Sequence, residues 1–145
     1  MNCGNCTICC KDLLIIDTDS PEGEYCKHCE KNVGCKIYSE RPEACRIFEC
    51  CWKQMEYAHI DLRPDNCGVL FEKYSDKVIV GSTEGELSDL IIGQIGFFQR
   101  EGISVLIINL KEKKRFFYLA EGHTIQSVEE DIRWRHQVIQ KTSQI

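Results

Sequence analysis

The chain has 145 residues, which suffices for one domain of ordinary size or for two small ones. Its hydrophobic fraction of 43% is typical of a globular protein, and its net charge of −5 disfavours non-specific binding to nucleic acid or to an anionic membrane. The sequence has no apolar run of about 18 residues and no basic, apolar leader, so we expect a cytoplasmic protein without a membrane partner.

The first part of the chain, residues 1–67, shows little regular periodicity. We expect a short strand at 13–16, a turn over 17–23, and a helix over 40–48 with Pro42 in its first turn. Such a segment cannot bury a large core by itself. A bound metal would supply the missing stability, on the order of 10 kcal/mol for each structural site.

The second part, residues 68–145, alternates between strand and helix patterns. The expected strands are 69–71, 78–80, 103–108 and 116–119, and the expected helices are 86–100 and one that Thr124 caps. The order strand, strand, helix, strand, strand, helix predicts an α+β fold, with an antiparallel sheet of four strands and both helices on one face. We therefore predict an irregular, cysteine-rich, metal-binding domain at 1–67 and a ββαββα domain at 68–145.

The 11 cysteines all lie at or before Cys67. A disulfide framework usually serves a secreted chain that is too small to build a core, whereas this chain has an odd number of cysteines and no export signal. Clustered thiols in a reducing compartment are a liability unless something ligates them. The cysteines therefore favour a metal site over disulfides or redox-active thiols alone.

The spacing of the cysteines is that of metal-binding turns. The chain begins Cys3-x2-Cys6-x2-Cys9-Cys10, and two intervening residues allow both sulfurs to reach one ion. Neighbouring side chains diverge, so the adjacent Cys9 and Cys10 favour two metal centres or two irons of one cluster. Further cysteines follow at Cys26, Cys29, Cys35, Cys45, Cys50 and Cys51.

The identity of the metal stays open between zinc and an iron–sulfur cluster, since both accept four thiolates. The first three cysteines match the start of a bacterial ferredoxin run, but the fourth position falls on Leu13. Ligand type alone favours zinc by a small margin.

These blocks, with the run from Gly34 to Cys50 and the later Leu62-Arg63-Pro64-Asp65, resemble the bacterial YkgJ-type cysteine cluster proteins. That family is described as a zinc- or iron-chelating CxxCxxCC domain, and the resemblance covers about residues 3–68. The resemblance implies a set of eight metal ligands: Cys3, Cys6, Cys9, Cys10, Cys26, Cys35, Cys45 and Cys50. Cys29, Cys51 and Cys67 are extra to that set. A looser resemblance to the flagellin lysine methylase implies an iron–sulfur cluster.

Other candidate residues have two readings each. His28, within the second Cys-x2-Cys turn, is a metal ligand or an exposed loop residue. Arg46 and Arg63 either relieve the negative charge of thiolates or are solvated. The remaining histidines, His59, His123 and His136, read as surface residues.

The sequence thus predicts a metal-binding module that has a structural role or mediates interaction with an unknown protein or peptide partner. The alternative is an iron–sulfur redox protein or a component of a metalloenzyme. Whether the chain is an enzyme stays open. No catalytic residue can be assigned, although a reactive thiol among the three extra cysteines fits the pattern.

Overall fold

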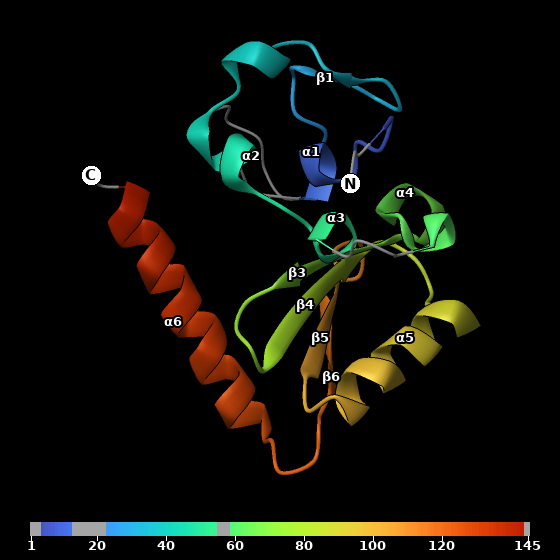
Figure 1. Cartoon of the computed structure of the whole chain (residues 1–145), viewed down its shortest axis with the longest axis vertical. Helices are drawn as coiled ribbons and strands as arrows, with labels where there is room; N and C mark the ends of the chain where they lie inside the picture. Colours follow the sequence, from blue (N-terminus) through green and yellow to red (C-terminus); the bar gives the residue numbers. More distant parts are fainter. Residues whose placement is uncertain (1–3, 13–22, 55–58, 144–145) are drawn as a thin grey trace.

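The computed structural model describes residues 4–12, 23–54 and 59–143, with side chains up to residue 135. Cys3, the strand expected at 13–16 and most of the turn expected after it lie outside the described residues. Figure 1 shows the cysteine-rich segments gathered at one end of the molecule, above a four-stranded sheet that two longer helices flank.

The cysteine-rich part consists of short elements joined by turns. They are α1 (Cys9–Asp12), β1 (Cys29–Glu30), β2 (Gly34–Cys35), η2 (Tyr38–Glu40), α2 (Glu43–Ile47), α3 (Cys51–Gln54), η3 (Ile60–Leu62) and α4 (Pro64–Cys67). The helix expected over 40–48 is present as α2, and Pro42 immediately precedes it instead of lying in its first turn.

The second part contains the larger elements. They are β3 (Val69–Lys73), β4 (Val78–Thr83), α5 (Asp89–Arg100), β5 (Ser104–Asn109), β6 (Lys114–Tyr118) and α6 (Ile125–Ser143). The strands lie in the order β3-β4-β5-β6, and β3–β4 and β5–β6 are antiparallel hairpins. The predicted α+β class and the order of elements are confirmed.

The prediction of a wholly antiparallel sheet is wrong, because the two central strands β4 and β5 run parallel. Helix α5 connects them, and this helical crossover returns the chain to the end of the sheet at which β4 began, so β5 runs in the same direction. Val78 of β4 therefore lies opposite Ser104 of β5, and the sheet is mixed.

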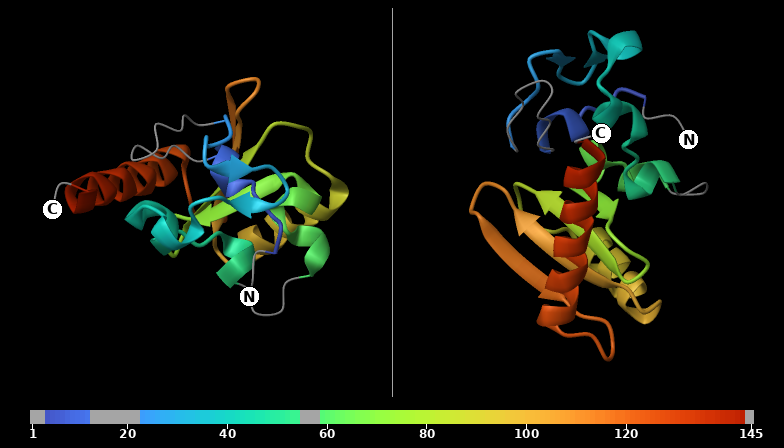
Figure 2. Two further views of the ribbon diagram at one scale, coloured as in Figure 1. Left: turned by 90° about the horizontal axis from the view of Figure 1, so that it is seen from above. Right: turned by 90° about the vertical axis from the view of Figure 1, so that its left-hand side faces the viewer.

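The prediction of both helices on one face is also wrong. Helix α5 packs with Ile91, Ile95 and Phe98 on one face of the sheet, whereas α6 packs with Val128 and Ile132 on the other. Figure 2 shows the two helices on opposite sides of the strands. The alternation of side chains along each strand supplies both faces: Val69, Phe71, Ile79, Val105 and Ile107 contact α5, and Val78, Val80 and Leu106 contact α6.

Polar side chains fix the ends of these helices. The Oγ of Ser88 accepts the Ile91 N–H at 3.3 Å, and Thr124 caps α6 as expected, since its Oγ1 accepts the Ser127 N–H at 3.0 Å. The fully buried Ser104 contacts Nδ1 of His123 at 2.6 Å. His123, expected at the surface, is therefore half-buried and contacts the sheet through Ser104.

Within the described residues, no helix is long and apolar enough to cross a membrane.

Strand β3 joins the cysteine-rich part to the sheet. Leu70 packs against Cys50 and Trp52, while Cys51 enters the core on the α5 side of the strand. The Trp52 indole N–H donates to the His59 carbonyl at 3.1 Å. This packing crosses the predicted domain boundary after residue 67, and the division into two domains stays a prediction.

Truncating the Leu70 side chain, which lies where β3 meets the cysteine-rich part, should destabilise the whole chain. Leu70 is 2% exposed, so Leu70→Ala should lower the free energy of unfolding by about 2–5 kcal/mol through lost burial and a residual cavity. Leu90→Ala is the matched control, because Leu90 is 49% exposed on α5. Urea unfolding measures both variants, and similar losses in the two would contradict the packing described.

Candidate metal centre

A chain of three thiols forms the centre of the cysteine-rich part. The Cys10 thiol is hydrogen-bonded to the side chains of Cys9 and of Cys29, which lies on the hairpin β1–β2. The backbone holds this arrangement, since the Cys10 N–H donates to the Thr7 carbonyl at 3.1 Å and the Cys10 carbonyl accepts the Cys26 N–H at 2.8 Å. Residues far apart in the sequence are thereby brought together at α1.

The hairpin adds two further cysteines to this centre. Cys35 lies directly opposite Cys29 in the antiparallel register, so the two side chains emerge on the same face of the ribbon. Cys26 begins the turn that leads into β1, and its carbonyl accepts the Cys29 N–H at 2.9 Å. The second Cys-x2-Cys turn and Cys35 therefore form one local unit next to Cys10.

Backbone N–H groups point at sulfur atoms in both Cys-x2-Cys turns. The Cys26 sulfur accepts the N–H of His28 at 3.4 Å, and the Cys6 sulfur accepts the N–H of Ile8. In each turn the donor lies two residues after the cysteine. Such donors favour a thiolate over a thiol, although at Cys6 burial outweighs them and raises the pKa.

The thiols of Cys9 and Cys10 titrate in opposite directions. The hydrogen bond from Cys10 lowers the pKa of Cys9 to about 7, against the opposing effect of burial. The same hydrogen bond, together with burial, raises the pKa of Cys10. Burial also raises the pKa of Cys6 to about 11 and raises the pKa of Cys29. One proton shared between neighbours thus stabilises a single thiolate at Cys9.

The remaining predicted ligands lie around this centre. Cys45, in α2, is half-buried and close enough for its charge to interact with Cys9, Cys26 and Cys35. The buried Cys50 lines one hollow with Cys6 and Cys9. Seven of the eight residues predicted as ligands therefore lie in this part of the structure, and Cys3 lies outside the described residues.

Thr7 is a part of this site that sequence reasoning missed. Its side chain is 2% exposed, its Oγ1 accepts the Asn32 N–H at 3.1 Å, and it also hydrogen-bonds the Cys29 thiol. Asn32 has a φ of +63°, which is tolerated by asparagine in a tight turn. Thr7 thus joins the hairpin to the first Cys-x2-Cys turn.

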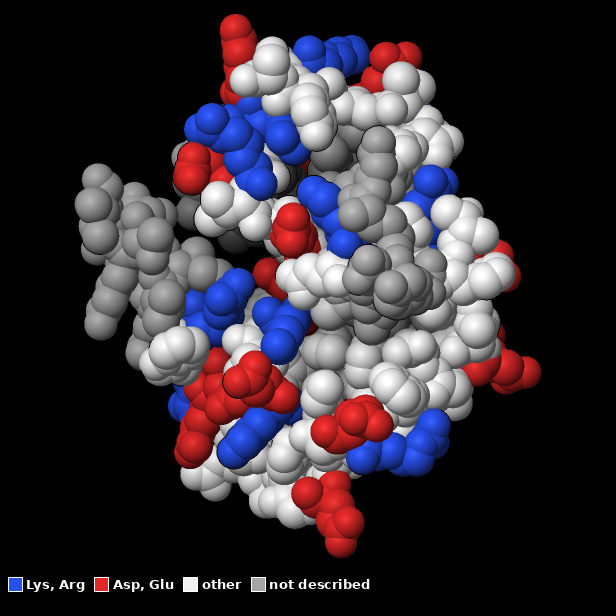
Figure 3. All heavy atoms as spheres, in the orientation of Figure 1, with Lys and Arg blue, Asp and Glu red and all other residues white. Residues whose placement is uncertain are grey.

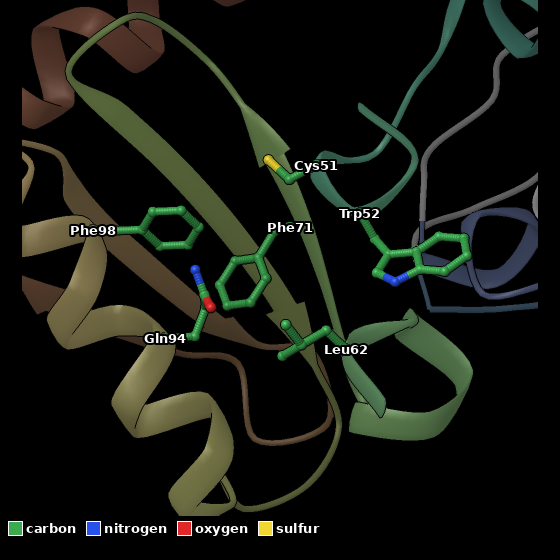
Figure 4. Close-up of a pocket in the computed structure, with 6 residues that line it drawn as sticks. All are labelled: Cys51, Trp52, Leu62, Phe71, Gln94 and Phe98. Atoms are coloured by element: carbon green, nitrogen blue, oxygen red, sulfur yellow. The ribbon is translucent and has the colours of Figure 1, made fainter. Parts of the chain in front are cut away.

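Two of the extra cysteines point away from the centre. Figure 4 shows Cys51 beside Phe71 and the α5 side of β3, and burial raises the pKa of its thiol to about 12. The Cys67 thiol contacts the carbonyls of Leu62 and Val69, at 3.4 and 3.3 Å. Both cysteines serve packing here.

The arginines expected near thiolates differ in their surroundings. Arg46 is exposed and pairs with Glu43 at 3.0 Å on the surface of α2. Arg63 instead makes two contacts of 2.6 Å with Asp65, beside the Cys6 loop. Figure 3 shows basic and acidic side chains interspersed over one face of the molecule.

Among the described residues, the sulfurs of Cys9, Cys10 and Cys29 are linked by hydrogen bonds through Cys10. Within residues 4–12, 23–54 and 59–143, no three side chains of His, Cys, Asp or Glu are arranged so that they could hold a metal ion. The cysteines in these ranges are free thiols.

Comparison with known proteins found no match to a protein-family model, to a curated protein or to a solved structure. The resemblance to the YkgJ-type proteins therefore stays an expectation that rests on the cysteine blocks.

The Cys9 thiolate should be detectable in metal-free, reduced protein. Above a pH of about 7 the Cys9 sulfur is ionised, so iodoacetamide should modify Cys9 before Cys51, whose pKa is about 12. Cys10→Ala removes the hydrogen-bond donor and should raise the pKa of Cys9, which slows its alkylation at pH 7.5. Peptide mass spectrometry measures the rates. An unchanged Cys9 rate in this variant would show that Cys10 does not stabilise the thiolate.

Proposed function

We propose that this protein binds metal, as zinc or as an iron–sulfur cluster, through thiolates of its N-terminal cysteines. The observation that carries the proposal is the contact of the Cys10 thiol with Cys9 and with Cys29. The N–H donors at Cys6 and Cys26 support it, since they favour sulfur as a thiolate.

Sulfurs in hydrogen-bond contact are about as far apart as sulfurs on one metal ion. With a Zn–S bond of 2.3 Å, two sulfurs at neighbouring corners of a tetrahedron are separated by about 3.8 Å. Three such thiols cannot all ionise in contact, because neighbouring negative charges repel each other. Divalent cations would replace the shared protons, so metal binding would release protons and draw the sulfurs of each site together.

We divide the cysteines into two groups, with Cys9 and Cys10 in different ones because the side chains of adjacent residues diverge, so that the Cys9–Cys10 contact lies between the two groups. The first group is Cys10, Cys26, Cys29 and Cys35, which the second Cys-x2-Cys turn and its hairpin hold together. The second group is Cys6, Cys9, Cys45 and Cys50. In this proposal Cys29 joins the ligands, although the family resemblance leaves it out, and Cys3, which the sequence spacing relates to Cys6, would supply a further thiolate.

Two closed groups of four thiolates suit structural zinc, and they equally suit iron–sulfur clusters. The ferredoxin-like spacing of Cys3, Cys6 and Cys9 supports the second candidate function, an iron–sulfur redox protein or metalloenzyme component. That the metal-binding module acts by holding a protein or peptide partner stays a prediction.

Replacing Cys10, whose thiol contacts both Cys9 and Cys29, should lower the metal content of the protein. Protein purified anaerobically from a reducing cytosol should contain stoichiometric zinc, or should be brown with iron and sulfide. Cys10→Ser should lose at least half of this metal, because a hydroxyl is a poor ligand for these metals. Elemental analysis and the visible spectrum measure the outcome.

Cys67→Ser is the matched control for that experiment. Its hydroxyl can keep the contacts with the two main-chain carbonyls, and the residue lies outside both proposed groups. Metal content should equal that of the wild type. Equal losses in both serine variants, or a wild type free of zinc and iron, would refute the proposal.

A further inference from the structure

We infer that Arg63 is a positioning residue for the Cys6 sulfur. It acts through its contacts with Asp65 and Asn5, and the absence of a side chain at Gly4 leaves space for its guanidinium. This inference rests on the proposed function, because it concerns the second group of thiolates. The chain segment before α4 thereby fixes a loop that lies some 60 residues earlier in the sequence, as the pairing of Arg63 with Asn5 at a separation of 58 residues shows.

The Arg63 guanidinium binds both segments at once. Its Nε and Nη2 donate to the two carboxylate oxygens of Asp65, each at 2.6 Å, and Nη2 also donates to Oδ1 of Asn5 at 2.8 Å. The Arg63 and Asp65 side chains are only 14% and 15% exposed. A bidentate, largely buried pair of this kind is more specific than a surface ion pair, because the planar fork matches the carboxylate.

Asp65 holds the Cys6 sulfur in two ways. Its backbone N–H donates to the sulfur, and its carboxylate accepts the Cys6 thiol proton. When a metal replaces that proton, the carboxylate would face a thiolate, and the charge of Arg63 offsets the repulsion. Arg63 therefore acts on Cys6 by orienting and neutralising Asp65, without touching the metal.

The backbone of the loop is shaped to the same guanidinium. Gly4 has a φ of +59°, and a Cβ at this position would lie 2.8 Å from Nη1 of Arg63. A side chain here would thus strain the backbone and displace the arginine. Gly4 and Arg63 are therefore expected to act on one property, the placement of Cys6.

The test is a double-mutant cycle on metal affinity in the full-length protein. Arg63→Lys keeps the charge but loses the fork, and Gly4→Ala displaces the guanidinium. Each should weaken binding of Co²⁺ to the second group by about 10-fold or more, with Co²⁺ as the probe and competition with a chelator as the measurement. The double variant should lose about as much as either single variant, because both act on the same contact.

Two controls separate this role from general damage to the fold. Arg46→Lys alters an exposed pair, with side chains 54% and 71% exposed, and Gly122→Ala meets no atom within 4 Å at a similar φ of +80°. Both controls should bind Co²⁺ as the wild type does. The cobalt absorption bands should shift in Arg63→Lys and Gly4→Ala only, and urea unfolding of metal-free protein reports any loss of stability.

Asn5→Ala provides a variant that leaves Arg63 and Asp65 in place, and it should also weaken binding. Wild-type affinity in Arg63→Lys, or losses that add in the double variant, would overturn the inference while metal binding itself stands. A wild type that binds no Co²⁺, zinc or iron would overturn the proposed function and the inference together.

Discussion

Contact between sulfur atoms is the constraint on which the cysteine-rich part of this protein depends. The Cys10 thiol lies between Cys9 and Cys29, and neighbouring thiols can share a proton but cannot all ionise. The opposite shifts in the pKa of Cys9 and of Cys10 express this competition. A bound cation would resolve it, because it would let every sulfur carry its charge. The short helices and the two-residue strands around the centre are what the metal proposal predicts of a segment with little apolar core.

The sheet contributes a rigid support for this centre. Leu70 on β3 packs against Cys50 and Trp52, so one proposed ligand is fixed by the same contacts that close the core. The Arg63–Asp65 pair lies at the start of α4, the helix before β3, and Arg63 contacts Asn5 beside Cys6. The second part of the chain therefore contacts the cysteine-rich part through Leu70, and the segment before β3 contacts a loop that lies far earlier in the sequence.

The sequence predicted the local elements well because their signals are local. Thr124 was recognised as a cap, and each of the four expected strands overlaps a strand of the sheet. The topology was not recognised. The continuous run Val105-Leu106-Ile107 indicates a strand buried on both faces, which requires a helix on each side, and α5 is long enough for a parallel crossover.

Prediction of the candidate site has a similar limit. The Cys-x2-Cys spacing identifies which sulfurs can share a turn, but it cannot show that Cys29 lies against Cys10 or that Cys35 lies opposite Cys29. Those contacts depend on the register of a hairpin and on Thr7, whose role has no sequence signature. Arg46 and Arg63 looked alike in the sequence, whereas burial and the bidentate pairing with Asp65 distinguish them in the fold.

X-ray absorption at the metal edge of anaerobically purified protein tests the central claim most directly. The account predicts bound zinc or iron whose nearest neighbours are sulfur atoms, at about 2.3 Å for zinc. Nearest neighbours that are only oxygen or nitrogen, at about 2.0–2.1 Å, would contradict it, as would a sample without either metal.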